Sequence, residues 1–150
     1  MLPFMWASQI KSFKGSTAVM TNGNTIFTIT GGPIRIEEMG SVCVTANGAS
    51  ATTLQYSSTP TVGSATTISG ASGSLANATA GTVVYLAPAT LATAPTIVTA
   101  AGGGLILSIQ TNKIIVKEGT ITMVVGTGPT TGTWYHFIRY SPMTPDSLVN

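Results

Sequence analysis

The chain has 150 residues, of which only 7% are charged, against roughly a quarter in an ordinary soluble protein. Its net charge of +2 comes from cations scattered along the chain, and phosphate binding needs clustered ones, so we expect no nucleic-acid partner. No apolar run of about 18 residues occurs, so we expect no transmembrane helix and no membrane partner. A single cysteine, Cys43, excludes an intrachain disulfide.

Residues 39–112 form a long stretch without any charged side chain. It is built mainly from Thr, Ser, Ala, Gly and Val, so its surface would be rich in hydroxyl groups and weakly hydrated. Interfaces between proteins are depleted of charges at their centres, because a buried charge must lose its water. The stretch is therefore typical of a surface that lies against other protein.

The first segment, residues 1–16, is apolar at its start and has its lysines and a glycine near its end. Its large apolar side chains fall partly on one helical face: Phe4, Trp6, Ile10 and Phe13. Chain ends often fray, but three aromatic rings favour a docking arm or a short helix that packs on the domain or on a neighbouring subunit. No basic region precedes the apolar start, so we expect no signal peptide. We predict an N-terminal arm, residues 1–16, and one domain, residues 17–150.

Short β-type runs follow the arm, separated by Gly, Pro, Asn and Ser. Asn22-Gly23 is a strong hairpin signal between residues 17–20 and 25–30. The later runs that we predict as strands are residues 34–45, 52–56, 82–86, 96–99, 105–109, 113–116, 120–125 and 134–140. No helix-length connection separates them, which disfavours a parallel sheet. The sequence predicts an all-β chain, folded as an antiparallel β-sandwich or a small, jelly-roll-like barrel.

Residues 57–81 are the least patterned part of the sequence, a run of Ser, Thr, Gly and Ala. One interpretation is a flexible surface loop, because such residues bury little apolar surface. The other is an extended loop that lies on a neighbouring chain, which short side chains would permit. The sequence leaves both interpretations open.

His136 is the only histidine, and a hydrolytic triad would need a serine and a carboxylate beside it. The carboxylates of the chain are Glu37, Glu38, Glu118 and Asp146. No Gly-x-Ser-x-Gly elbow occurs, and His136 lies within an aromatic strand, so a structural histidine is favoured over a small hydrolase. One Cys, one His and four dispersed carboxylates form no metal-ligand pattern. We predict no catalytic residue, no metal site and no cofactor.

Glu37 and Glu38 are neighbours on a predicted strand, so their side chains should point to opposite faces. This is the wrong geometry for the paired carboxylates of a glycosidase. Residues two apart in a strand share a face, so we predict an ion pair between Arg35 and one of the two glutamates.

The densest aromatic patch of the chain lies in residues 134–140. As a strand it places Trp134, His136 and Tyr140 on one face and Tyr135 and Phe137 on the other. Apolar character on both faces indicates that both are covered, by a second sheet and the arm or by another chain. We predict Trp134 and Tyr135 as partner contacts, together with the four apolar residues of the arm. Stacking of a carbohydrate on these rings is the alternative.

Two parts of the sequence carry a resemblance. The early run is Ile29-Thr30-Gly31-Gly32-Pro33-Ile34-Arg35-Ile36, and the later pattern is Lys117-Glu118-Gly119-Thr120-Ile121, Thr131-Gly132-Thr133-Trp134 and Ile138-Arg139-Tyr140-Ser141-Pro142. They resemble the opening strand and the final two strands of small β-rich virion proteins of tailed bacteriophages. The resemblance implies a capsid decoration (cement) protein or a component of a head or tail fibre. It carries no catalytic residues to transfer.

The resemblance and the uncharged stretch together predict a non-enzymatic structural protein of a phage virion. It would decorate and stabilise the capsid by binding across neighbouring capsid subunits, with the major capsid protein or other virion proteins as partners. We expect a symmetric homo-oligomer such as a trimer. The alternative is a fibre or tail component that binds a receptor or a glycan through its aromatic C-terminal strand.

Overall fold

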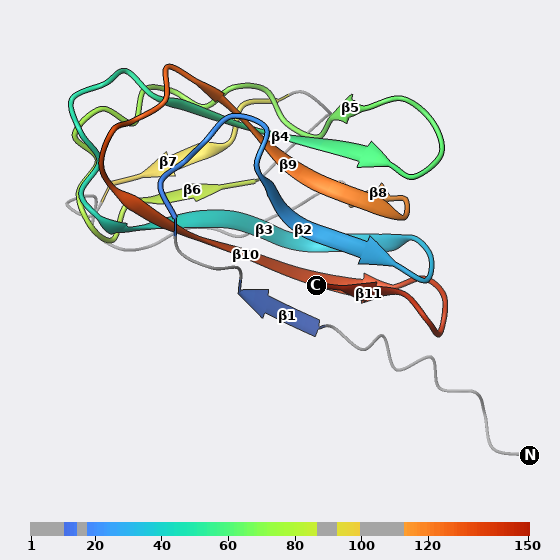
Figure 1. Ribbon diagram of the computed structural model, residues 1–150. Helices are drawn as coiled ribbons and strands as arrows, with labels where there is room; N and C mark the ends of the chain where they lie inside the picture. Colours follow the sequence, from blue (N-terminus) through green and yellow to red (C-terminus); the bar gives the residue numbers. More distant parts are fainter. Residues whose placement is uncertain (1–10, 15–17, 87–92, 100–112) are drawn as a thin grey trace, which may run out of the picture.

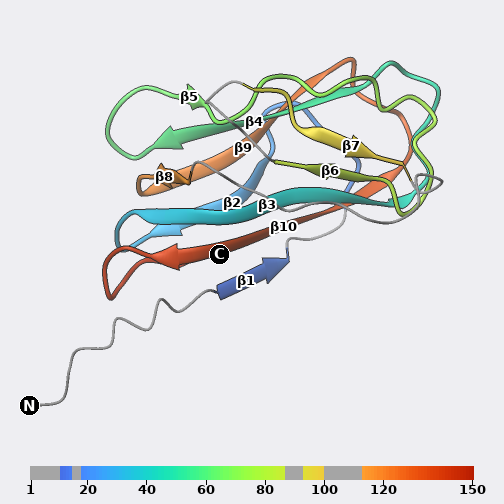
Figure 2. The ribbon, with the colours of Figure 1, turned by 180° about the vertical axis from the view of Figure 1, so that it is seen from behind.

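The computed structural model describes residues 11–14, 18–86, 93–99 and 113–150. In these residues all regular structure is β, and two antiparallel sheets pack face to face (Figure 1, Figure 2). The predicted all-β class and the β-sandwich are confirmed. The predicted strand at residues 105–109 lies outside the described residues.

Each sheet is a run of antiparallel neighbours. The first has the order β1 (Lys11–Lys14), β10 (Thr133–Pro142), β3 (Ile34–Thr45), β6 (Val83–Tyr85) and β7 (Thr96–Val98), with β8 (Ile114–Val116) also paired to β3. The second has the order β11 (Leu148–Val149), β2 (Thr25–Thr30), β9 (Gly119–Gly126), β4 (Thr53–Pro60) and β5 (Thr66–Thr67). Neighbours in space are mostly distant in sequence, so the fold depends on long-range pairing.

The longest strands, β3 and β10, pair along their whole length in the first sheet. On β10 alternate residues face the core, from Trp134 to Tyr140. On β3 the buried row changes parity between Ile36 and Met39, because the register skips one residue at Glu37. An extra residue in one strand of an antiparallel pair is a β-bulge, and it locally disrupts the ladder. This bulge determines how the charged residues of β3 are placed.

The Asn22-Gly23 turn forms, with Gly23 at a φ of 83°, but it does not join the two strands of a hairpin. Before the turn, Ala18 bridges to Trp134 in the first sheet, and after it β2 belongs to the second sheet. The chain crosses between the sheets here, and Met20, just before the turn, is buried in the core. The predicted hairpin is therefore wrong, although the turn is where the sequence placed it.

Residues 57–60 belong to β4, residues 61–67 are exposed, and residues 68–75 pack along β4. The backbone N–H groups of Leu54 and Tyr56 donate hydrogen bonds to the hydroxyls of Ser72 and Ser69, each at 3.0 Å. Ile68, beside them, is buried in the core. The serine hydroxyls accept bonds that a neighbouring strand would otherwise accept, so the interpretation as a flexible loop does not fit residues 68–75. For the exposed residues 61–67 both interpretations stay open.

Within the predicted arm, Lys11–Lys14 forms β1, which runs antiparallel along β10 (Figure 1, Figure 2). Phe13 lies opposite Ile138. This stretch is a strand, so the short-helix alternative is wrong for it. Phe4, Trp6 and Ile10 lie outside the described residues, and their contact role stays a prediction.

Candidate functional site

Most charged residues of the described chain gather at one end of the sandwich, here called the charged end. They come from β3, β10, the β8–β9 hairpin and the turn before β11: Arg35, Glu37, Glu38, Lys113, Lys117, Glu118, Arg139 and Asp146. The register brings these segments together, because Arg35 lies opposite both Ile115 of β8 and Ser141 of β10. Lys11 and Lys14 are on β1, which pairs with residues 137–140 of β10 beside this group.

The other end, here called the uncharged end, is made by three loops without a charged residue: residues 46–52, 74–82 and 127–132. The backbone N–H of Asn47 donates to the carbonyl of Ala78 at 2.8 Å, and that of Asn77 to the carbonyl of Gly48 at 2.9 Å. A Cβ atom at Gly132 would lie only 2.8 Å from the Cα of Asn47. The three loops therefore form one continuous surface.

The exposed surface of residues 39–99 has the same character. Every exposed residue that the structure describes in this range is Thr, Ser, Ala, Gly, Val or Asn. Short side chains lose little rotamer freedom on contact, and hydroxyl groups lose less hydration energy than charges do. This surface is thus suited to burial against another protein.

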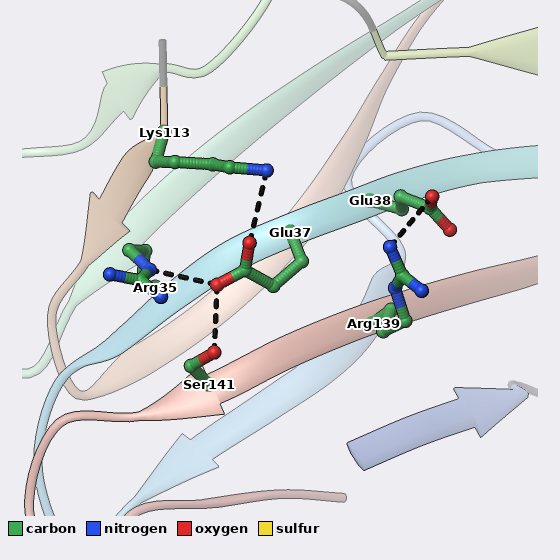
Figure 3. A network of polar contacts seen from close by, with 6 residues as sticks. All are labelled: Arg35, Glu37, Glu38, Lys113, Arg139 and Ser141. Carbon is green, nitrogen blue, oxygen red and sulfur yellow. Dashed lines mark hydrogen bonds and ion pairs between the residues drawn. The ribbon is translucent and has the colours of Figure 1, made fainter. Parts of the chain in front are cut away.

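At the charged end, one buried carboxylate binds three partners (Figure 3). Arg35 Nε donates to Glu37 Oε1 at 2.8 Å, and Ser141 Oγ donates to the same oxygen at 2.7 Å. Lys113 Nζ lies 3.0 Å from Glu37 Oε2. The predicted pair between Arg35 and a glutamate is confirmed. Glu37 links β3 to β10 and to the residue that precedes β8.

The β-bulge decides on which face the two glutamates lie. Glu38 lies opposite Arg139, with 2.9 Å between Glu38 Oε1 and Arg139 Nη2. Ser141, which binds Glu37, is two residues further along β10 and so shares a face with Arg139. Both glutamates are therefore on the outer face of the first sheet. The prediction of opposite faces is wrong, because a bulge interrupts the regular alternation.

Burial opposes the negative charge of Glu37, but hydrogen bonds from Ser141, Lys113 and Arg35 outweigh it and lower the pKa of the carboxyl from 4.5 to about 2. At neutral pH Glu37 stays ionised and holds no proton to donate. Glu37 therefore has a structural role: its carboxylate holds β3, β10 and the residue before β8 together.

Replacing Glu37 with glutamine should destabilise the fold by about 2 kcal/mol at pH 7, because three hydrogen bonds to a charged acceptor are weakened. The folded pKa is below the unfolded one, so the contribution of Glu37 is complete above pH 4.5 and is lost as the pH falls toward 2. Urea unfolding at several pH values should show that the free energies of unfolding of wild type and Glu37→Gln converge between pH 4.5 and 2. Glu38→Gln is the control, with a loss below about 1 kcal/mol, since Glu38 and Arg139 are more exposed. A constant difference between wild type and Glu37→Gln down to pH 2 would contradict the prediction.

A second polar cluster lies inside the sandwich. Ser41 Oγ is 2.7 Å from His136 Nδ1 and 2.7 Å from the hydroxyl of Tyr56. The exposed fractions of Ser41, His136 and Tyr56 are 0%, 3% and 0%. A serine thus lies beside the histidine, as a triad requires, but both groups are closed off from any substrate. Burial lowers the pKa of His136 from 6.5 to about 4.

Trp134 does not contact a partner, and here the structure corrects the prediction. Its side chain is 0% exposed, and its Nε1 donates to Asn47 Oδ1 at 3.3 Å. A strand residue that faces the opposite sheet is covered by that sheet, so Trp134 is part of the core. Tyr135 points the other way and is half-buried, so it keeps a surface for a partner.

A groove of about 270 Å³ opens between the β4–β5 hairpin and β8. Its described lining includes the buried Ile68 and Val116, whereas Val62 and Ile115 are exposed to solvent. Lys117 is the one charged residue in that lining. The groove mixes apolar side chains with the hydroxyl residues Ser58, Ser64, Thr66 and Thr67, and it offers no acid–base pair among these residues.

Among the residues that the structure describes, no three His, Cys, Asp or Glu side chains come together as a metal site. The same residues contain no helix long and apolar enough to cross a membrane. Comparison of the chain with family models, curated proteins and solved structures finds no match.

Proposed function

We propose that the chain is a non-enzymatic structural protein of a tailed-bacteriophage virion, which decorates and stabilises the capsid by binding across neighbouring capsid subunits. The observation that carries this proposal is the uncharged end, together with the uncharged exposed surface of residues 39–99. The resemblance of residues 29–36, 117–121, 131–134 and 138–142 to small virion proteins supports the phage setting.

The physical argument is one of desolvation. A protein that binds only the assembled shell stabilises the shell by mass action, so each contact must gain more free energy than it loses in hydration. A surface of hydroxyl, methyl and glycine groups has no charge to desolvate. Placing the charges at the opposite end keeps that end hydrated and the protein soluble before assembly.

Contact through side chains is favoured over addition of a strand. The described edge strands are short, with four residues in β1, three each in β7 and β8, and two each in β5 and β11. A short edge presents few free N–H and C=O groups to a neighbouring chain. We therefore assign capsid contact to the uncharged end.

The rival proposal is a receptor- or glycan-binding fibre that uses the aromatic C-terminal strand. The aromatic surface that this rival proposal needs lacks its largest ring, because Trp134 is buried in the core. Tyr135 and Phe137 are half-buried and too few to form a stacking platform on their own. The uncharged surface therefore favours the capsid proposal.

Placing a charge on the uncharged end should weaken attachment to capsids. Thr79→Glu adds a carboxylate that must be desolvated on contact, and we expect at least a tenfold loss of affinity, about 1.4 kcal/mol. The measurement is co-sedimentation with capsids from which the chain has been stripped. The matched control is Thr30→Glu, the same change at an exposed threonine of the charged end, for which we expect less than about a twofold loss.

Two results would contradict the proposal. Absence of the chain from purified virions, measured by quantitative mass spectrometry, would remove the virion setting. Equal effects of Thr79→Glu and Thr30→Glu would leave the virion setting intact but remove the uncharged end as the contact surface.

A further inference from the structure

The buried polar cluster joins the two sheets. Tyr56 lies on β4 in the second sheet, and Ser41 and His136 lie on β3 and β10 in the first. The two contacts, both 2.7 Å, run from the tyrosine hydroxyl through the serine to His136 Nδ1. The three groups are thus a hydrogen-bonded chain across the core.

One arrangement of protons makes both hydrogen bonds of this chain and leaves neither hydroxyl proton without an acceptor. With His136 neutral and protonated at Nε2, Nδ1 accepts the proton of Ser41 Oγ. Ser41 Oγ then accepts the proton of the Tyr56 hydroxyl. If Nδ1 carries a proton, it must donate to Ser41 Oγ, which must in turn donate to the Tyr56 oxygen. The Tyr56 hydroxyl proton then loses its acceptor within the chain, and a buried unpaired donor is unfavourable.

Among the side chains that the structure describes, no charged neighbour stabilises an imidazolium at this place. The titratable groups on the inner faces around His136 are Tyr56 on β4, Cys43 on β3 and Tyr140 on β10 itself. The inner faces of the adjacent β6 and β9 are apolar at the described positions, with Val84 and Met123 as examples. Among the described buried residues the one carboxylate is Glu37, on the outer face.

We infer that the chain Tyr56–Ser41–His136 is an acid-sensitive latch, which holds the two sheets together while His136 is neutral and opens when His136 binds a proton. The latch is independent of the proposed capsid role. Its physical basis is that a charge enters an apolar core at the same time as the cross-sheet bonds reverse direction.

The sign of the pH dependence follows from the two states of His136. The unfolded chain binds this proton near pH 6.5, whereas the folded chain resists it until about pH 4. Stability is therefore complete above pH 6.5 and is lost as the pH falls toward 4. Between pH 7.5 and 5.0 the equilibrium constant of unfolding should rise about 30-fold. Because the chain has one histidine, no other side chain has an ordinary pKa in this window.

The decisive comparison is with His136→Asn, which keeps an acceptor near the position of Nδ1 but does not titrate. This variant is less stable than wild type at pH 7.5, but its equilibrium constant should change less than about twofold down to pH 5.0. The measurement is urea unfolding followed by circular dichroism at both pH values. Equal pH dependence in the two proteins, or none in the wild type, would overturn the inference.

A direct readout does not depend on the variant. Nitrogen-detected NMR of folded wild-type protein at pH 7.5 should show His136 with Nδ1 unprotonated, and the ring should not titrate between pH 7.5 and 5.5. A protonated Nδ1 at neutral pH would overturn the direction of the latch. A ring that titrates near pH 6.5 without loss of structure would overturn the latch itself.

Discussion

Replacing Trp134 with alanine should destabilise the folded chain by about 3–5 kcal/mol, the usual range for removing a large aromatic side chain from a core. The residue is 0% exposed, and its indole N–H is bonded to Asn47, which lies in a loop of the uncharged end. Small domains have a free energy of unfolding of only about 5–15 kcal/mol, so the variant loses a large part of its stability. Urea unfolding at neutral pH measures the loss.

The neighbouring residue supplies the control. Tyr135 is half-buried on the opposite face of β10, so Tyr135→Ala should cost about 1 kcal/mol or less. The pair distinguishes a core residue from a contact residue. If Trp134→Ala unfolded at the same urea concentration as wild type and lost only its binding to capsids, the assignment of Trp134 to the core would be wrong.

The face of each residue on β10 could be predicted from the sequence, because a regular strand alternates with a period of two. That alternation correctly groups Trp134, His136 and Tyr140 on one face. Local pattern does not say what covers a face, so it indicates a partner contact for Trp134 where the second sheet in fact covers it. The sequence of one strand does not reveal whether a distant part of the same chain covers it.

The bulge at Glu37 is not readable from the sequence. In the structure the buried apolar residues fall at even positions up to Ile36 and at odd positions from Met39, but Val42 and Val44 are apolar at even positions too, so the sequence shows no change of parity. A strand that stays paired can change parity only by adding a residue, which is a β-bulge. The alternation therefore has to be taken separately on each side of Glu37.

The latch could not be predicted from the sequence either. Ser41 and His136 are 95 residues apart, and Ser41 and Tyr56 are 15 apart, so their meeting depends on the order of strands in two sheets. Strand order is set by long-range pairing, which local turn signals do not encode. The Asn22-Gly23 turn is an example, because its flanking residues join different sheets.

Replacing Gly119 with alanine should destabilise the fold by about 3 kcal/mol or more, because two unfavourable terms add. Gly119 begins β9 and pairs with both Ile29 of β2 and Pro60 of β4. Its φ is 146°, a backbone conformation that other residues rarely adopt. A Cβ atom there would collide with the carbonyl oxygen of Thr59 and lie 2.6 Å from the Cα of Pro60. These are backbone atoms of a paired strand, so they cannot rotate away.

Variants at two other glycines measure the backbone strain separately from the steric collision. Gly23 has a φ of 83°, and a Cβ atom added there would have nothing within 4 Å, so Gly23→Ala should show backbone strain alone, about 1 kcal/mol. Gly128 has neither a positive φ nor a close neighbour, so Gly128→Ala should change stability by less than about 0.5 kcal/mol. Urea unfolding of the three variants should give the order Gly128, Gly23, Gly119 in rising cost. If Gly119→Ala lost no more than Gly23→Ala, the close packing of β9 between β2 and β4 at the charged end would be contradicted.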